Sequence, residues 1–273
     1  MKVIEWNINH RYGYSKKEMP KWIKDVIEKE EATIIVLTET SFKVPNWEYE
    51  YRNLFDRNDY YVFCSNNTAV GNNEVTIAIK KDCFNIEYIK SYLSEGHQYP
   101  DHLEVHCIHK ITNKKFVIVG VRIHAISISN QQKREEFNAV LKSVKYDENV
   151  MIVGDFNNYR RGFYDENWCL SKINELATKE GFSMYTPQGG SIYQDNYGAY
   201  SFPEDHVFIK GQLNINTYKY ERSLFTSRDK TVYKWKTDFQ KYKGKDKNGK
   251  CLYDNIDDPF PDHAILEADF DIK

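Results

Sequence analysis

Val150-Met-Ile-Val-Gly-Asp-Phe-Asn157 joins a short apolar run to two polar side chains. The apolar residues Val150 to Val153 are typical of a short buried strand. Asp155 and Asn157 follow directly, at the point where this strand would end. Strand ends hold side chains rigidly and let several of them converge on one cleft. The stretch therefore predicts a buried strand with candidate site residues at its carboxyl end.

Similar polar residues flank strand-like runs along the rest of the chain. They are Asn7 after Val3-Ile4-Glu5-Trp6, Glu39 after residues 34–38, His124 after residues 117–123, and Asp205 and the pair Asp262-His263, which precede apolar runs. We expect sheet edges to bring these side chains into one cleft.

The chain begins with a β-α-β pattern. Residues 2–8 alternate like a strand, apolar residues between Met19 and Ile27 recur at helical spacing, and residues 33–37 form a second apolar run. Strand-like runs follow in the pattern of an antiparallel sheet, at residues 60–64, 75–79, 86–92, 103–108 and 116–123.

The second half repeats this outline. Ser129 or Asn130 can cap a helix that carries Phe137 on its apolar face, and residues 165–181 predict another helix that stops at Gly181. Further strands are expected at residues 206–209, 213–218 and 264–270. No linker rich in Pro, Gly or Ser divides the chain, so we expect one domain over residues 1–273, with two sheets and outer helices.

The composition indicates a globular protein of a reducing compartment. The chain has 273 residues, is 41% hydrophobic and carries a net charge of −2, so the molecule as a whole is not a basic surface for nucleic acid. No apolar run approaches the roughly 18 residues of a membrane span, and no secretory h-region is visible. The five cysteines show no C-x-x-C spacing, which favours reduced thiols and a cytoplasmic location.

Six motifs, in this order, resemble the endonuclease/exonuclease/phosphatase superfamily, whose members include deoxyribonuclease I, exonuclease III, abasic-site endonucleases, sphingomyelinases and inositol polyphosphate 5-phosphatases. The motifs are Trp6-Asn-Ile-Asn9, Leu37-Thr-Glu39, Arg122-Ile-His124, Gly154-Asp-Phe-Asn157, Asp205 before a strand, and Asp262-His263. They span nearly the whole chain. The resemblance implies an α/β fold, a four-layer α-β-β-α sandwich of two mostly antiparallel sheets flanked by helices. The sequence departs from the family at Pro261, where serine is usual.

The resemblance also implies a metal site and a pair of oriented histidines. The implied metal ligands are Glu39, Asn7 and Asp262. The implied catalytic residues are His263 oriented by Asp205, His124 oriented by Glu74, and Asp155 and Asn157, which would bind the attacking water and a phosphate oxygen.

The chemistry of these residues supports the same reading independently. The carboxylates of Glu39, Asp155, Asp205 and Asp262 would repel one another in one cleft unless a cation is bound. Oxygen ligands select a hard ion, so Mg²⁺ is the expected cofactor, with Mn²⁺ or Ca²⁺ as alternatives. A histidine with a pKa near 6.5 can take or give a proton at neutral pH, as phosphodiester hydrolysis requires.

Other polar residues fit no family motif. We expect Asp101-His102 to lie in a surface loop, with a phosphate contact as the alternative, and His206 to be a strand residue. Arg160-Arg161 is either a phosphate grip or a solvated pair. Residues 228–250 hold nine Lys or Arg against three Asp, with aromatic residues between them, and form either a solvated loop or a nucleic-acid surface.

The preferred interpretation is a metal-dependent phosphodiesterase that cuts DNA endonucleolytically without strong sequence preference. Two alternatives stay open: a phosphatase or phosphodiesterase for a lipid or small phosphate, and a binding module that kept the fold and lost turnover. The intact set of site residues argues against the binding module, whereas distortion of the site by Pro261 would favour it.

Overall fold

The structure is a computed structural model and describes residues 1–10, 21–41, 54–55, 59–65, 72–91, 100–125, 128–158, 168–194, 199–221, 261 and 263–273.

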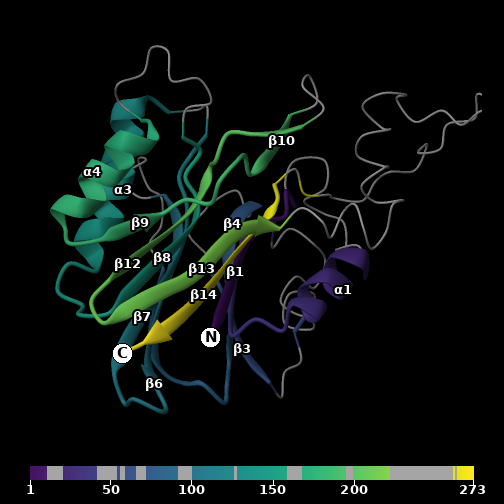
Figure 1. Cartoon of the computed structure of the whole chain (residues 1–273), viewed down its shortest axis with the longest axis vertical. Coiled ribbons are helices and arrows are strands. Elements are labelled where there is room, and N and C mark those ends of the chain that lie inside the picture. Colours follow the sequence, from purple (N-terminus) through teal and green to yellow (C-terminus); the bar gives the residue numbers. More distant parts are fainter. Residues whose placement is uncertain are drawn as a thin grey trace, which may run out of the picture.

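Two six-stranded sheets form the centre of the molecule (Figure 1). The first has the order β13 (Leu213–Glu221), β14 (Ile265–Ile272), β1 (Lys2–Asn7), β2 (Ile34–Ser41), β4 (Asn72–Lys80), β3 (Tyr60–Cys64). The second has the order β5 (Phe84–Ser91), β6 (Asp101–His109), β7 (Lys115–Arg122), β8 (Val150–Asp155), β12 (Asp205–Lys210), β9 (Ser183–Tyr185), and a separate ribbon pairs β10 (Ile192–Gln194) with β11 (Ala199–Ser201). Each six-stranded sheet has one parallel pair, β1 with β2 and β7 with β8, among antiparallel ones.

A helix crosses over between the strands of each parallel pair. α1 (Lys21–Glu30) lies between β1 and β2 in the chain, and α3 (Asn130–Ser143) lies between β7 and β8. Ser129 begins α3 with a capping box in which its hydroxyl accepts from the amide of Gln132. α4 (Leu170–Lys179) ends just before Gly181, whose φ of 82° suits glycine. The second half therefore repeats the β-α-β outline of the first, as the sequence predicts.

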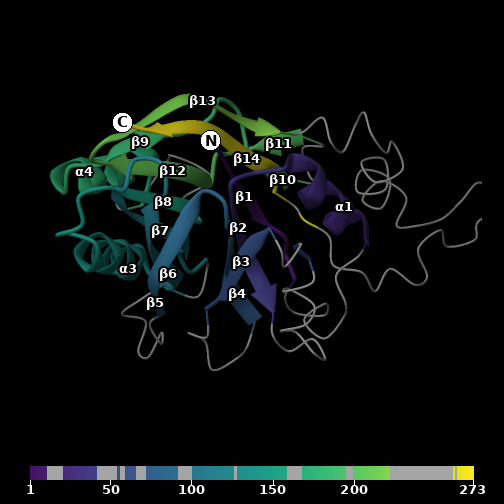
Figure 2. The ribbon, with the colours of Figure 1, turned by 90° about the horizontal axis from the view of Figure 1, so that it is seen from below.

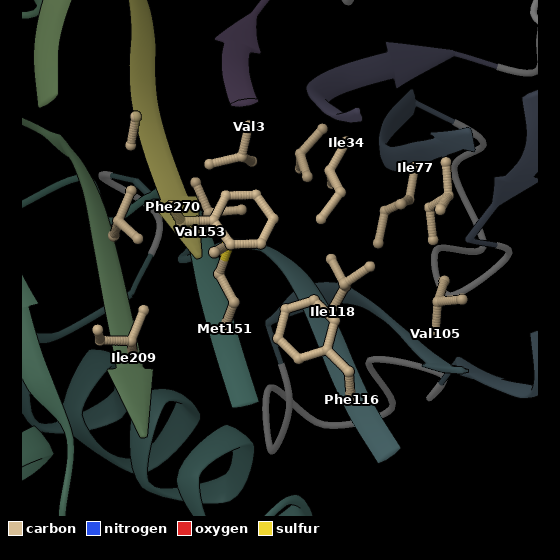
Figure 3. Close-up of a cluster of buried hydrophobic side chains, with 14 of the residues drawn as sticks. Val3, Ile34, Ile77, Val105, Phe116, Ile118, Met151, Val153, Ile209 and Phe270 are labelled. Atoms are coloured by element: carbon tan, nitrogen blue, oxygen red, sulfur yellow. The ribbon is translucent and has the colours of Figure 1, made fainter. Parts of the chain in front are cut away.

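Three apolar clusters define four layers. The central cluster fills the space between the sheets, and Figure 3 shows Val3, Ile34 and Ile77 of the first sheet facing Ile118, Met151 and Val153 of the second. A second cluster packs α1 on the outer face of the first sheet through Ile23 and Ile27. A third packs α3 and α4 on the outer face of the second sheet through Phe137 and Ile173. Figure 2 shows these helices on opposite sides of the paired sheets, so the predicted α-β-β-α sandwich is confirmed.

The prediction of a surface loop at Asp101-His102 is wrong. Both residues begin β6, and both side chains are fully buried. Asp101 pairs in register with Arg122 of β7, so a charge partner on the next strand allows an acidic residue to enter the sheet. The three-residue strands β9, β10 and β11 were not predicted, because runs this short carry little periodicity. None of the helices in the described ranges has the length and apolar character to cross a membrane.

Candidate active site

A row of charged side chains crosses the second sheet at one end of its strands. Asp101 of β6 is in register with Arg122 of β7, Arg122 with Asp155 of β8, and Asp155 with Asp205 of β12. Alternate residues of these strands, such as Leu103 and Val153, belong to the cluster between the sheets. The period of two along a strand therefore directs the row toward the first sheet.

The first sheet adds polar residues that face this row. Asn7, at the end of β1, donates from Nδ2 to Oδ2 of Asp155 across 3.0 Å and so links the two sheets. Glu5, two residues earlier, is fully buried and accepts from the hydroxyl of Thr38 at 3.0 Å. Glu39 is also buried, and its Oε1 accepts from Nε of Arg122 at 2.9 Å.

Glu39 owes its direction to an irregular stretch of β2. Its φ is 55°, in the left-handed region that non-glycine residues rarely adopt, and the register with β4 shifts between Leu37 and Thr40. Such irregularities change the direction of a side chain. They cost conformational free energy, and strained residues of this kind are found most often at functional sites. The bend turns Glu39 toward Arg122 of the opposite sheet.

Asp155 and Asn157 form one hydrogen-bonded turn after β8. The amide of Asn157 donates to Oδ1 of Asp155 at 2.8 Å, and its side-chain Nδ2 donates to Oδ2 at 2.9 Å. Nδ2 also donates to the carbonyl of Ile123 at 2.8 Å, which ties this turn to the end of β7. Lys133 of α3 reaches the carbonyl of Asn157 at 2.9 Å. The turn is thus held from two neighbouring elements.

His263 and Asp205 form the expected pair. Nδ1 of His263 lies 2.8 Å from Oδ2 of Asp205, and the indole of Trp6 donates to the carbonyl of His263 at 3.0 Å. An isolated bridge to Ile192 of β10 fixes the same backbone. Pro261 is buried, and His263 keeps its hydrogen bond to Asp205 beside it. The distortion that would have favoured an inactive binding module does not affect this pair.

His124 is held by Glu136 of α3, which corrects the expected pairing with Glu74. Nδ1 of His124 lies 2.5 Å from Oε1 of Glu136, and the amide of His124 donates to Oε2 at 3.1 Å. Glu74 instead accepts from the hydroxyl of Ser65 at 2.7 Å. Glu74 belongs to β4 of the first sheet, whereas α3 packs directly over the end of β7 where His124 lies.

The buried acids carry an excess of negative charge. Arg122 supplies one positive charge to a cluster that contains Glu5, Glu39, Asp101, Asp155 and Asp205. Burial raises the pKa of Asp101 to about 6, against the charges of His124 and Arg122. Burial also raises the pKa of Asp155 to about 6, with a further contribution from Asp205. Burial, followed by the charges of Asp205 and Asp155, raises the pKa of Glu5 well above its usual range. An added cation would relieve this repulsion.

The arrangement fits a divalent cation. Oε2 of Glu5 and Oδ1 of Asp205 are buried and accept no hydrogen bond from the described residues. Ligand atoms of Asp155, Asp205 and His263 lie within 4.8 Å of one another. We assign Nδ1 of His263 to the hydrogen bond with Asp205, because 2.8 Å is an ordinary hydrogen-bond length. Carboxylate and amide oxygens remain for the ion, which is the ligand set of Mg²⁺, Mn²⁺ or Ca²⁺.

The structure brings most of the predicted residues to this site. Hydrogen bonds link Asn7 and Asn157 to Asp155, and His263 to Asp205, whose ligand atoms lie within 4.8 Å of those of Asp155. Glu39 and His124 connect through Arg122 and Asp101, and Arg122 is in register with Asp155. Asp262, Arg160-Arg161 and residues 228–250 lie outside the described residues. His206 is a strand residue, as expected: its ring bonds Asn158 and Thr186, and burial lowers its pKa to about 3.

Sequence reasoning missed four members of the cluster, namely Glu5, Asp101, Arg122 as a site residue, and Glu136. Glu5 lies two residues from both Val3 and Asn7, so the alternation of side chains along a strand places it on the same face as Asn7. This spacing could have predicted Glu5 as a site residue. Asp101 and Arg122 become neighbours only through the register of β6 and β7. Glu136 lies in a run of charged helical residues that offers no signal of its own.

The comparisons with known proteins agree with this architecture. No family model matches the sequence, and no curated protein matches it. Several solved structures match over nearly the whole chain. Humanized D. rerio TDP2 has a TM-score of 0.66 at 11% identity, over 99% of this chain and 98% of that chain. An endonuclease/exonuclease/phosphatase from Bacteroides vulgatus has a TM-score of 0.64 at 14% identity, over 100% and 98%.

A third match is the mannosyl-6-phosphatase Bt3783 of Bacteroides thetaiotaomicron, with a TM-score of 0.63 at 12% identity, over 99% of each chain. At these identities the likeness concerns the fold. Together with the two facing sheets and their outer helices, it leads to one conclusion: the chain has the fold of the endonuclease/exonuclease/phosphatase superfamily.

Proposed function

We propose that this protein is a divalent-metal-dependent phosphodiesterase, acting as a single domain over residues 1–273. The observation that carries the proposal is the presence of two histidines, each bonded through Nδ1 to a buried carboxylate, beside one acidic cluster. In-line attack on a phosphodiester needs a proton acceptor for water and a proton donor for the leaving oxygen, and this pair supplies both.

His263 is the proposed general base. Asp205 accepts from Nδ1, so the free Nε2 of the neutral ring is left to take a proton from water. Asp155, with Asn157 attached to it, lies beside the pair and would orient that water and a phosphate oxygen. The two bonds from Asn157 fix the carboxylate before substrate arrives, which lowers the ordering cost of the step.

His124 is the proposed general acid. Burial lowers its pKa, but the hydrogen bond to Glu136 and the charges of Asp101 and Glu136 outweigh burial, so the pKa is raised. The protonated ring can then donate from Nε2 to the leaving oxygen at neutral pH. Glu39, with Asn7 and Asp262, would hold a Mg²⁺ ion, which when bound would neutralise charge on the phosphate.

DNA is the proposed substrate, cut internally with little sequence preference. A D. rerio TDP2 structure of the same fold is complexed with a single-strand DNA product, which supports a nucleic acid. The mannosyl-6-phosphatase of the same fold supports the alternative of a small phosphate ester. We also propose a cytoplasmic location, because the cysteines show no C-x-x-C spacing and no disulfide links Cys64, Cys83, Cys107 and Cys169 within the described part of the chain.

The test is a substrate panel of plasmid DNA, abasic DNA, RNA, sphingomyelin, inositol phosphates and a sugar phosphate, each with Mg²⁺, Mn²⁺ or EDTA. We expect Mg²⁺-dependent nicking of plasmid DNA that EDTA abolishes. His263→Ala should lower the rate by about 10²–10⁴-fold, the usual loss when a general base is removed. The variant should stay folded because His263, although buried, belongs to none of the three apolar clusters that hold the layers together.

The outcomes separate the candidate functions. Cleavage of a sugar phosphate or lipid with intact DNA would replace the nuclease by the small-phosphate alternative. If no substrate of the panel is turned over, the alternative of a binding module without catalytic activity would remain. An equal rate for wild type and a folded His263→Ala would refute the assigned base.

A further inference from the structure

Arg122 is a fully buried cation at the centre of the charged row. Its side chain is 2% exposed, and it contacts a carboxylate on each side. Nε and NH2 both lie 2.9 Å from Oε1 of Glu39, and NH1 lies 3.3 Å from Oδ2 of Asp101. A planar guanidinium imposes direction on both partners, whereas a lysine would offer only a point charge.

The contact with Glu39 is one-sided. Both nitrogens of the fork lie against Oε1, so Arg122 occupies one carboxylate oxygen of Glu39 and does not use Oε2. Glu39 lies where the register of β2 with β4 shifts and its own φ is 55°. The ladder with β4 is interrupted here, although the carbonyl of Glu39 accepts from the amide of His10 at 2.9 Å on the other side. The contact from the opposite sheet adds a constraint on the side chain that the backbone bonds do not supply.

Asp101 joins this contact to the proposed general acid. Its Oδ2 contacts Arg122, and its Oδ1 lies 3.9 Å from Nε2 of His124. The groups that face His124 are Asp101 from β6, Arg122 from β7 and Glu136 from α3. Oδ1 of Asp101 accepts no hydrogen bond from the described residues, so its charge is available to the ring.

We propose that Arg122 and Asp101 form a positioning pair that aims Glu39 at the metal ion and holds His124 beside the reacting phosphate. The inference rests on the proposed function, since it assigns Glu39 to the ion and His124 to the leaving oxygen. A purely structural ion pair is a weaker explanation, because apolar residues replace a buried ion pair with little loss of stability. The pair touches both halves of the proposed machinery, which a stability role does not require.

The first experiment measures Mg²⁺ binding by isothermal titration calorimetry, without any substrate. Arg122→Lys keeps the positive charge and removes the fork, so we expect its Mg²⁺ dissociation constant to rise by about 10–100-fold, as for other partners of metal ligands. The matched control is Glu104→Gln, a buried acid of the same strand as Asp101 that bonds His106 on the outer face. Its Mg²⁺ affinity should equal that of wild type.

A wild-type measurement covers the case in which Arg122→Lys does not fold. The ¹H–¹⁵N resonance of Arg122 Nε–H should shift when Mg²⁺ is added, because the ion draws electron density from the carboxylate that accepts this proton. Asp101→Asn should lower the pKa of His124, followed by its imidazole resonances, while Glu104→Gln leaves that pKa unchanged. A structural role for Asp101 would not move it.

Each result decides a separate claim. Equal Mg²⁺ affinity in wild type and Arg122→Lys, or an Arg122 resonance that ignores saturating Mg²⁺, would overturn the role assigned to Arg122. An unchanged His124 pKa in Asp101→Asn would overturn the role of Asp101. A wild type that binds no Mg²⁺ would overturn the metal site of the proposed function and the role of Arg122 with it. A wild type that binds Mg²⁺ but cleaves nothing would overturn the proposed hydrolysis and the placement of His124 beside the reacting phosphate, while the role of Arg122 toward Glu39 would stand.

Discussion

His124 and His263 present the same design at the scale of single residues, with partners from different elements. Asp205 starts the strand beside Asp155, while Glu136 comes from α3 and uses both of its oxygens on His124. A histidine bonded through Nδ1 keeps one tautomer and one ring orientation, which a proton-transfer role requires. In the proposed mechanism the two carboxylates therefore determine which ring nitrogen faces the substrate.

Glu136→Gln tests this at His124. The folded-state pKa of His124 is raised, so the protonated, active form of a general acid survives to a higher pH than an ordinary histidine would allow. The rate should fall as pH rises through that pKa. Removing the charge of Glu136 lowers the pKa, and the fall should begin about 1–3 pH units lower. The profile of kcat/KM against pH measures this.

Glu74→Gln is the matched control for that profile. Glu74 accepts a hydrogen bond from Ser65 and not from His124. The alkaline limb of the pH profile of Glu74→Gln should therefore coincide with that of wild type. A shifted limb in Glu74→Gln together with an unshifted one in Glu136→Gln would restore the pairing implied by the family resemblance.

At the scale of elements, the sequence predicts most strands and both crossover helices because their apolar periods are clear. The capped start of α3 and the glycine after α4 are local signals, and both are present. Register is different. The contact between Asp101 and Arg122 depends on how β6 slides along β7, and the direction of Glu39 depends on a left-handed residue within β2. The residues near these positions in the sequence indicate neither the register nor the left-handed conformation, so the site was predicted only in part.

Gly154 offers a test of how closely β7 and β8 must approach. A Cβ at this position would lie 1.8 Å from the carbonyl oxygen of Val121, which belongs to the neighbouring strand. Overpacking typically lowers the free energy of unfolding by about 1–3 kcal/mol. Backbone cannot move aside as a side chain can, so Gly154→Ala should lower the free energy of unfolding by about 3 kcal/mol or more. Urea denaturation of the variant measures the loss.

Gly120→Ala is the comparison for this variant. Its Cβ would lie 2.6 Å from Cγ1 of Val75, a side-chain atom between the sheets. Cγ1 of Val36 would also lie 2.8 Å away. Both contacts are with side chains, which can turn where backbone cannot, so the loss of unfolding free energy should be smaller than for Gly154→Ala. The reverse order would show that the space between the sheets, and not the β7–β8 pair, is the tighter constraint.

At the scale of the whole molecule, the sandwich holds a group of like charges between its two sheets. The pKa of Asp101 and that of Asp155 are both raised to about 6, above the ordinary value of 3.8. The folded chain therefore binds protons between about pH 4 and pH 6 that the unfolded chain releases. Without an ion, this contribution to stability is present at low pH and is lost as pH rises through 6. The folded chain alone does not offset this loss of stability, whereas a bound cation would, because it neutralises the ionised carboxylates.

Stability should consequently depend on Mg²⁺ and pH together. Protonation of Asp101 and Asp155 removes negative charge beside the ion that Glu39 would hold, so the ion binds more tightly as these protons leave. We expect Mg²⁺ to raise the Tm strongly at pH 7.5 and hardly at pH 5, with the change centred near pH 6. At 100 times its dissociation constant the ion adds about 2.7 kcal/mol. The pKa of His206 is lowered to about 3, so acidification also lowers the stability of the fold through this residue, by the same amount with and without Mg²⁺.

The measurement is a pair of melts, one in Mg²⁺ and one in EDTA, at each pH. The difference in Tm between the two melts reports the acidic cluster alone. A Tm increase of the same size at pH 5 and pH 7.5 would place the ion away from Asp101 and Asp155, and no increase at either pH would exclude a metal site among these acids.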